Sequence, residues 1–175
     1  MKRNPEFSIV IPFYNEKKNI PLVLNAYQKI KNSSVYSFEL LCINNGSTDG
    51  SEDLFAKLLK NKKYPFARLV TVKKNKGYGF GIMSGVSRAK GDVIAWTHAD
   101  MQTDAKDPFR AYEEYMRFNN KKTVIKGKRI KRPLSAVLFS LGMAIIASFY
   151  LKKWFYEINA QPKLFHRSFL PLLKN

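Results

Sequence analysis

A short apolar run, Val93 to Trp96, opens directly into a loop dense with polar side chains. The run follows the turn pair Gly91-Asp92 and contains no charge, which is typical of a strand buried on both faces of a sheet. Six side chains able to bind a ligand crowd the loop after it: Thr97, His98, Asp100, Gln102, Thr103 and Asp104. Open α/β sheets bind ligands beyond the carboxyl ends of buried parallel strands, so we expect a site here.

Strand and helix patterns alternate along most of the chain. We expect strands over residues 7–11, 38–43, 68–72, 93–96 and 123–126. Helices are expected between them: one with apolar residues at 20, 23, 24, 27 and 30, one over 52–60, one that the segment 75–81 opens and that continues through Arg88, and one from Pro108 to about Phe118. This alternation predicts an α/β fold with a mainly parallel sheet flanked by helices. A further apolar segment, Leu134–Leu151, is expected to form a separate helix.

Three helix starts have recognisable cap signals. Asn15 is expected to cap the first helix, and Asp107 with the following proline to cap and begin the fourth. Asp49 and Glu52 have the spacing of a capping box for the second helix.

The charge and cysteine content limit the possible partners. Lysine and arginine total 31 against 13 acidic residues, which gives a net charge of +18. Such a surplus indicates an anionic partner: a nucleotide, a nucleic acid or an acidic lipid surface. We expect no nucleic acid, because the basic residues cluster beside an apolar helix and no RNA-binding signature is found. The single cysteine, Cys42, excludes an internal disulfide and is expected to be buried.

The polar loop has two interpretations when taken alone. Its carboxylates, amide and imidazole could hold a divalent cation, since a cation bound to phosphates needs only one or two protein carboxylates. Asp100 and Asp104 could instead cap turns.

Four motifs favour the first interpretation. They are SIVIPFYNE at 8–16, INNGSTDGS at 43–51, NKGYG at 75–79 and HADMQ at 98–102. Their order and spacing resemble those of family 2 glycosyltransferases, which have the Rossmann-like GT-A fold. The nearest branch resembles the polyprenol-phosphate sugar transferases of the dolichol-phosphate mannose synthase type. The resemblance implies inverting transfer of a sugar from a UDP- or GDP-linked donor to a polyprenyl phosphate, with Mn²⁺ or Mg²⁺ as cofactor.

The resemblance also assigns site residues. Donor binding is implied for Pro12, Tyr14, Glu16, Asn44, Asn45, Lys76 and Gly77. The family normally carries two aspartates where Asn44 and Asn45 stand, so base recognition is expected to differ. Asp100 matches the second aspartate of the family's metal motif and is the expected catalytic and metal-binding residue, together with His98 and Gln102. An imidazole in place of the first aspartate favours manganese or a later metal, unless His98 donates directly to a phosphate.

Acceptor binding is implied for Arg129, Lys131 and Lys163. Arg129 matches the family's Gly-any-Arg position, although general attraction of the basic segment 126–132 to anionic lipid is an alternative. Leu141 stands where relatives often have a basic residue. A phosphate acceptor needs no general base, whereas a saccharide hydroxyl acceptor would need one, for which Glu113 and Glu114 remain open.

The last part of the chain indicates membrane association. Leu134–Leu151 has no charge and would measure about 27 Å as a helix, close to the thickness of a bilayer core. Residues 159–167 resemble a segment that returns to the active site, so we expect an interfacial helix at the cytoplasmic face of a membrane. We divide the chain into a nucleotide-sugar-binding core, 1–126, and an appendage, 127–175, and expect the family's C-terminal part to be missing. The alternative is a catalytically impaired protein that binds a nucleotide-sugar. It is favoured by the two asparagines, by His98 and by the short C-terminal part.

Overall fold

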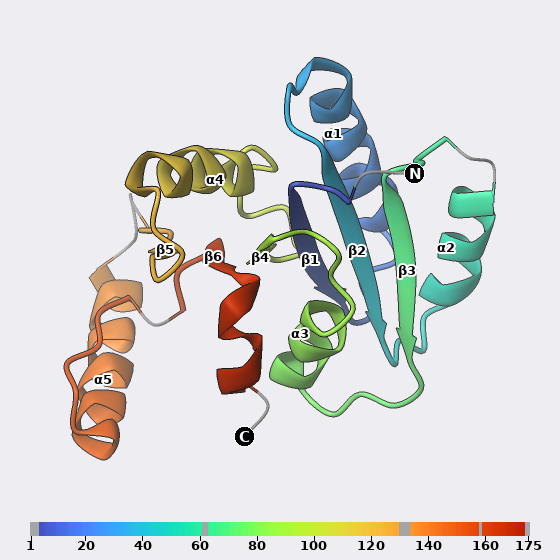
Figure 1. Cartoon of the computed structure of the whole chain (residues 1–175). Coiled ribbons are helices and arrows are strands. Elements are labelled where there is room, and N and C mark those ends of the chain that lie inside the picture. Colours follow the sequence, from blue (N-terminus) through green and yellow to red (C-terminus); the bar gives the residue numbers. More distant parts are fainter. Residues whose placement is uncertain (1–3, 61–62, 130–133, 158, 174–175) are drawn as a thin grey trace.

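The computed structural model describes residues 4–60, 63–129, 134–157 and 159–173, and it shows a mixed α/β fold (Figure 1). Its described strands form one six-stranded sheet in the order β3-β2-β1-β4-β6-β5. These strands are β1 (Phe7–Phe13), β2 (Phe38–Asn45), β3 (Ala67–Val72), β4 (Val93–Trp96), β5 (Val124–Lys126) and β6 (Lys163–His166). The first four are parallel, whereas β6 pairs antiparallel with both β4 and β5. The expected mainly parallel sheet is confirmed.

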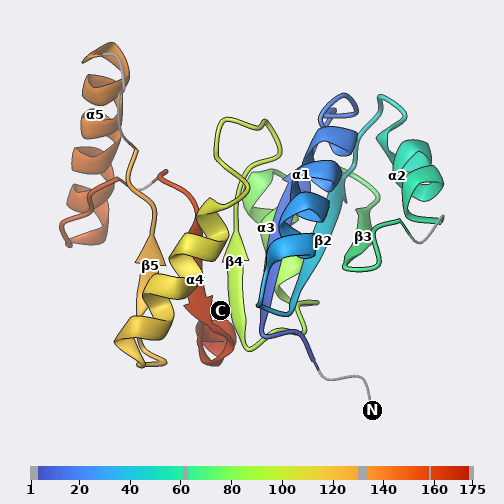
Figure 2. The ribbon, with the colours of Figure 1, turned by 90° about the horizontal axis from the view of Figure 1, so that it is seen from above.

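Helices cover both faces of the sheet, as seen from above in Figure 2. The covering helices are α1 (Ile20–Ser33), α2 (Ser51–Lys60), α3 (Tyr78–Val86) and α4 (Asp107–Phe118), and a fifth helix, α5 (Leu134–Leu151), does not pack on the sheet. Alternate residues of β1 point to opposite faces: Ile9 packs in a core with α1, α2 and α4, and Val10 packs in a second core with α3. This two-sided burial is what the unbroken apolar strands predict.

Aromatic packing joins α4 to the first strand. The Phe7 ring stacks on Tyr112 at a centroid distance of 4.4 Å and meets Phe109 edge-on at 5.1 Å. Each such pair contributes about 0.5–1.5 kcal/mol beyond the burial of its area. Because α4 follows the polar loop after β4, this packing fixes one end of that loop.

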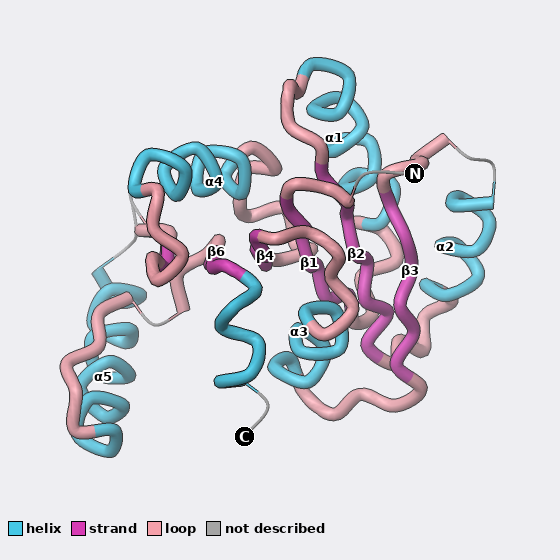
Figure 3. Tube along the Cα trace, in the orientation of Figure 1, coloured by secondary structure: helices cyan, strands magenta, loops and turns pink. Residues whose placement is uncertain are grey.

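The segment after residue 159 forms a strand, β6, that was not expected from its residue pattern. Figure 3 shows β6 running into a short helix, Arg167–Leu173. Leu164 and Phe165 are buried on opposite faces, in the first and second cores respectively. The return segment therefore belongs to the same sheet as the donor-side strands.

Two of the expected caps are wrong, and the third takes a different form. Asn15 adopts a positive φ of 55° and accepts a bond from the Thr48 amide at 2.8 Å, while α1 starts five residues later. Asp107 lies inside α4 and pairs with Arg110 at 2.7 Å. Asp49 accepts from the Ser51 amide at 3.0 Å, which caps the turn before α2. Asn15 and Asp49 therefore bond to loop residues, and Asp107 pairs within α4, instead of capping helices as the local pattern predicts.

Burial confirms the expectation for Cys42, which is a free, fully buried thiol. Helix α5 has the predicted bounds and stands apart from the sheet in both Figure 1 and Figure 2. Among the helices described, none has the length and apolar content needed to cross a membrane.

Candidate active site

The loops after β1 and β2 are tied to each other at the carboxyl edge of the sheet. The Asn15 amide donates to Ser47 Oγ at 3.1 Å, and the Lys17 amide donates to Asp49 Oδ2 at 3.0 Å. These bonds, with the one from Thr48 to Asn15, hold the intervening residues in place. Tyr14 and Glu16 are consequently presented beside one another at the rim of a cleft.

The cleft has a volume of about 250 Å³ and lies where β1 and β4 end. It brings together side chains from four separate loops: Pro12, Phe13, Tyr14, Glu16, Asn45, Asn75, Gly77, Tyr78, His98, Ala99 and Asp100. Seven of these are among the site residues that the family resemblance implies. Asn44, Lys76 and Gln102 do not line it.

Asn44 and Asn45 have different tasks. Asn44 is buried and accepts a bond from the Ser47 amide at 3.2 Å, so it shapes its own loop. Asn45 donates through Nδ2 to Gly77 O at 3.1 Å and to Asn75 Oδ1 at 3.3 Å. Its Oδ1 is buried and has no hydrogen-bond partner among the residues that the structure describes. A buried acceptor that lines a cleft is available to a ligand N–H or O–H group.

The segment 75–77 needs a glycine. Gly77 has a φ of 96°, which other residues rarely adopt, and its amide donates to Asn75 Oδ1 at 2.7 Å. Lys76 is exposed, and its ammonium lies 5.1 Å from the centre of the Phe80 ring. Asn75 and Gly77 line the cleft, whereas Lys76 does not.

Only one of the two loop aspartates lines the cleft. Asp100 Oδ1 accepts from the Gln102 amide at 3.1 Å, in a turn that gives Met101 a φ of 59°. Asp104 accepts from the Lys106 amide at 2.9 Å and lies 3.6 Å from Arg110. Asp104 therefore caps a turn, whereas Asp100 is oriented towards the space that a ligand would occupy.

His98 contacts Tyr78, a residue for which no role was expected from the sequence. Its Nδ1 lies 3.1 Å from the hydroxyl of Tyr78, and the two rings stack at 5.5 Å. Gln161 donates to the same hydroxyl at 2.7 Å. Burial lowers the pKa of His98, and Lys163 and Arg129 lower it further against the opposing effect of Asp100. The lowered pKa favours the neutral form of the imidazole.

The donor set suits one particular kind of metal site. Within the described residues, no three His, Cys, Asp or Glu side chains gather closely enough to enclose an ion. The cleft instead offers one carboxylate, Asp100, beside the imidazole of His98. A divalent cation that takes its other ligands from a diphosphate and water needs no more than this.

Two of the three expected acceptor residues, Arg129 and Lys163, lie in β6 or just after β5, the strands that extend the sheet beyond β4. Arg129 pairs with Glu157 at 3.0 Å and donates to Ser140 Oγ at 3.3 Å, which ties α5 to the end of the β5 segment. The Lys163 ammonium lies 5.6 Å from the centre of a Trp96 ring. Burial lowers the pKa of Lys163, and the nearby Lys126 and Arg129 lower it further. Lys131 lies outside the described residues.

Glu113 and Glu114, the alternative bases, do not line the cleft. Glu114 pairs with Arg117 at 3.1 Å on the outer surface of α4.

Solved structures define the class of fold. A mannosyltransferase from Pyrobaculum calidifontis, in complex with GDP-mannose and Mn²⁺, superposes with a TM-score of 0.66 at 18% identity, covering 99% of this chain and 48% of that one. At this identity the likeness concerns the fold alone, which is that of the GT-A glycosyltransferases.

The sequence then defines the family. The model of glycosyl transferase family 2 matches residues 8–165, and the chain belongs to that family. An undecaprenyl-phosphate 4-deoxy-4-formamido-L-arabinose transferase of Pseudomonas syringae pv. syringae is 30% identical over 100 residues, 57% of this chain and 29% of the relative. A dolichyl-phosphate β-glucosyltransferase of Dictyostelium discoideum is 28% identical over 118 residues, 65% of this chain and 36% of the relative. The chain therefore spans about a third of the curated relatives it matches.

Proposed function

We propose that the protein transfers a sugar, with inversion, from a UDP- or GDP-linked donor to a polyprenyl phosphate. The observation that carries the proposal is the cleft itself, which Asp100 lines together with residues of the loops assigned to the donor, at the ends of parallel strands. The names of the curated relatives, which describe sugar transfer to undecaprenyl and dolichyl phosphates, support the acceptor class.

Donor binding precedes the chemical step, and the cleft offers side chains for it. The exposed Tyr14 ring and Glu16 at the rim suit the base and ribose, and the unpartnered Oδ1 of Asn45 accepts from a ligand donor. Asp100 and His98 face the diphosphate. A divalent cation held by Asp100, when bound, neutralises negative charge on the departing diphosphate.

The acceptor oxygen attacks the anomeric carbon from the face opposite the diphosphate. A phosphate acceptor is already ionised at neutral pH, so it needs no residue to remove a proton. This agrees with a cleft whose acidic lining residues are Glu16 and Asp100, which are assigned above to the donor and to the cation. Arg129 and Lys163 are the cations assigned to the acceptor phosphate.

To test this proposal, metal-dependent sugar transfer is measured for the variant Asp100→Asn and for the matched control Asp104→Asn. Both variants remove one negative charge from the same loop, but only Asp100 lines the cleft. We expect Asp100→Asn to lower kcat by about a hundredfold or more, as for loss of a group that stabilises transition-state charge, and Asp104→Asn to retain most activity. Equal activities of the two variants would contradict the mechanism.

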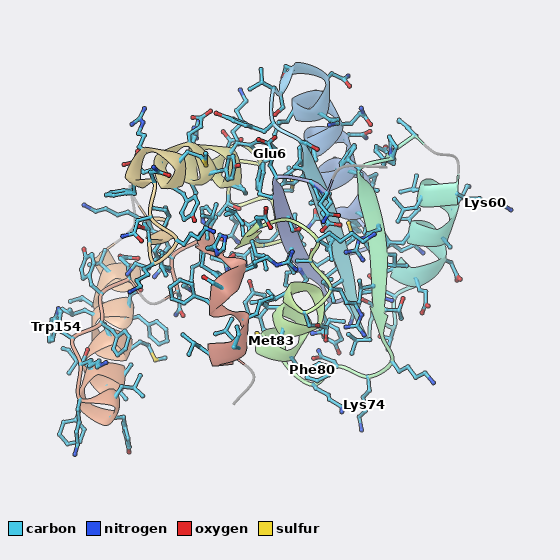
Figure 4. All side chains as sticks on the ribbon, in the orientation of Figure 1. Glu6, Lys60, Lys74, Phe80, Met83 and Trp154 are labelled. Atoms are coloured by element: carbon cyan, nitrogen blue, oxygen red, sulfur yellow. The ribbon has the colours of Figure 1, made fainter. Side chains whose placement is uncertain are left out.

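We also propose that α5 lies on the cytoplasmic surface of a membrane. Large apolar side chains remain exposed along it: Val137, Leu138, Phe139, Leu141, Met143, Ile145, Ile146, Phe149, Tyr150 and Leu151. Trp154 follows, 74% exposed and on the side facing away from the sheet (Figure 4). Exposed lysines 152 and 153 adjoin this surface and favour anionic lipid.

Co-sedimentation with phosphatidylglycerol vesicles tests this orientation. Ile146→Glu should weaken binding roughly tenfold or more, because a buried Ile contributes about 2 kcal/mol. Leu22→Glu is the control, since Leu22 on α1 is 54% exposed and Ile146 is 57% exposed. Equal binding by both variants would remove α5 as the docking surface.

The alternative function is nucleotide-sugar binding without turnover, which the two asparagines and His98 favour. Calorimetry with GDP and UDP alongside a transfer assay separates the two. Binding without detectable transfer would support the alternative, and measured turnover would exclude it.

A further inference from the structure

A three-residue hydrogen-bond relay connects the return segment to the donor cleft. Gln161 Nε2 donates to the Tyr78 hydroxyl at 2.7 Å, and that hydroxyl lies 3.1 Å from His98 Nδ1. The three side chains come from the segment before β6, the start of α3 and the loop after β4. Tyr78 and His98 both line the cleft, whereas Gln161 lies outside its lining.

The direction of the relay follows from its first member. An amide nitrogen can only donate, so the Tyr78 oxygen accepts from Gln161 and its own proton is free to be donated. The nearest acceptor is His98 Nδ1. In a neutral imidazole with Nδ1 accepting, the proton lies on Nε2.

The opposite orientation of the Gln161 amide is less favourable. As described, the amide oxygen is buried without a partner. Rotating the amide would place both N–H groups where the oxygen now lies, without a partner among the described residues, and buried unpaired N–H groups are rarer than buried unpaired carbonyl oxygens.

The backbone around Gln161 holds it in place. The Gly127 amide donates to Pro162 O at 2.8 Å, and a Cβ at Gly127 would lie 2.2 Å from Gln161 O. The two segments are packed so closely that residue 127 must be a glycine. This contact fixes the backbone from which the Gln161 side chain reaches Tyr78.

We propose that Gln161 and Tyr78 are positioning residues that fix His98 as the Nε2–H tautomer, so that His98 donates a hydrogen bond to a diphosphate oxygen instead of binding the cation. The donation to diphosphate rests on the function proposed above, but the tautomer does not. This gives a neutral donor where the family has a carboxylate, and it leaves Asp100 as the sole anionic residue of the loop facing the diphosphate.

Nitrogen NMR of the ligand-free protein tests the tautomer. The chain has two histidines, so ¹⁵N-histidine labelling gives two imidazoles, which His166→Gln assigns. Wild-type His98 should show the Nε2–H form. Predominance of the Nδ1–H form, or an equal mixture, would overturn the inference.

Two variants test the relay. In Gln161→Glu the carboxylate can only accept, so the Tyr78 proton turns towards it and the tautomer of His98 inverts to Nδ1–H. Asn159→Asp is the matched control: it adds the same charge at an exposed position two residues away and should leave the tautomer unchanged. An unaltered tautomer in Gln161→Glu would overturn the relay.

Tyr78→Phe provides a second route if Gln161→Glu does not fold. It removes the intermediate hydroxyl, so both tautomers of His98 should become populated. If the spectrum of Tyr78→Phe still shows only the Nε2–H form of His98, another contact fixes the proton and the proposal is wrong.

Binding of GDP and UDP in buffer containing EDTA tests the donor role. Gln161→Glu should bind about tenfold more weakly than Asn159→Asp, the loss expected for one hydrogen bond to a charged group. Equal affinities of the two variants would overturn that role. If neither nucleotide binds the wild type, the proposed function fails, and the NMR result still decides the tautomer.

Discussion

The side-chain nitrogen of Asn45 donates to the carbonyl oxygen of Gly77 at 3.1 Å, and this bond ties the end of β2 to the residue before α3. The same nitrogen lies 3.3 Å from Asn75 Oδ1. Both partners are acceptors, so the position needs a donor. The family's usual aspartate cannot supply one, and the asparagine is therefore part of how this chain holds its glycine-containing loop.

Asn45→Asp, the substitution that restores the family pattern, should consequently be harmful. It places a carboxylate against two acceptor oxygens and should cost about 1–3 kcal/mol in the free energy of unfolding, measured by denaturant titration. Asn44→Asp should cost less, because Asn44 uses its oxygen to accept from Ser47 and a carboxylate keeps that function. Equal losses in the two variants would argue against a donor role for Asn45.

The central fold could be predicted because each strand carries its own pattern. The unbroken apolar run of β4 has the predicted bounds, and α5 has them too. Strand β6 cannot be predicted from its own residues, because the four of them include Lys163 and His166 and show neither a long apolar run nor a clear alternation. Its strand conformation depends on pairing with β4 and β5, which no local pattern records.

The cleft was predicted in part for a similar reason. Asp100, His98 and Asn45 follow strand ends that meet at one edge of the sheet, so their convergence follows from the topology. Gln161 reaches Tyr78 across 83 positions of the chain, and only the antiparallel return of β6 brings it there. Tyr78 belongs to the NKGYG motif, but the motif alone indicates no role for the Tyr78 hydroxyl. That role depends on the contacts of the hydroxyl with His98 and Gln161.

Two glycines of α3 should respond oppositely to alanine. A Cβ at Gly81 would lie 2.9 Å from Asn45 Cγ, whereas one at Gly79 would meet nothing within 4 Å. Gly81→Ala should lower the midpoint of thermal unfolding, because it pushes Asn45 from its bonds. Gly79→Ala should stabilise the protein by about 0.5–1 kcal/mol, the usual gain for alanine in a helix. A stabilising Gly81→Ala would show that the contact with Asn45 yields easily.

Acid should destabilise the fold through Glu39, which lies at the opposite end of the sheet from the cleft. Burial alone would raise its pKa, but bonds from Arg68 at 2.8 Å, Ser8 at 2.6 Å and the Lys90 amide at 2.6 Å outweigh it and leave the pKa below its ordinary value of 4.5. The stabilisation is therefore present above pH 4.5 and is lost as the pH falls through the lowered pKa.

Glu39→Gln should remove that part of the acid dependence. The variant should be less stable than the wild type at neutral pH, and the difference between them should shrink on acidification below pH 4.5. Denaturant titrations across the acid range measure it. The control is Glu113→Gln, an exposed residue of α4, for which the difference from the wild type should stay small at every pH. A constant difference for Glu39→Gln would refute the assigned pKa.

Arg129 separates specific acceptor binding from general attraction to anionic lipid. Its guanidinium is held by Glu157 and Ser140, whereas the adjacent Lys128 is exposed. Arg129→Met and Lys128→Met remove the same charge, but only the first removes a fixed donor group. We expect Arg129→Met to raise KM for polyprenyl phosphate about tenfold or more, the effect of one charge-assisted hydrogen bond, with the affinity for the nucleotide unchanged. Equal increases in both variants would favour general attraction of the basic segment to the membrane.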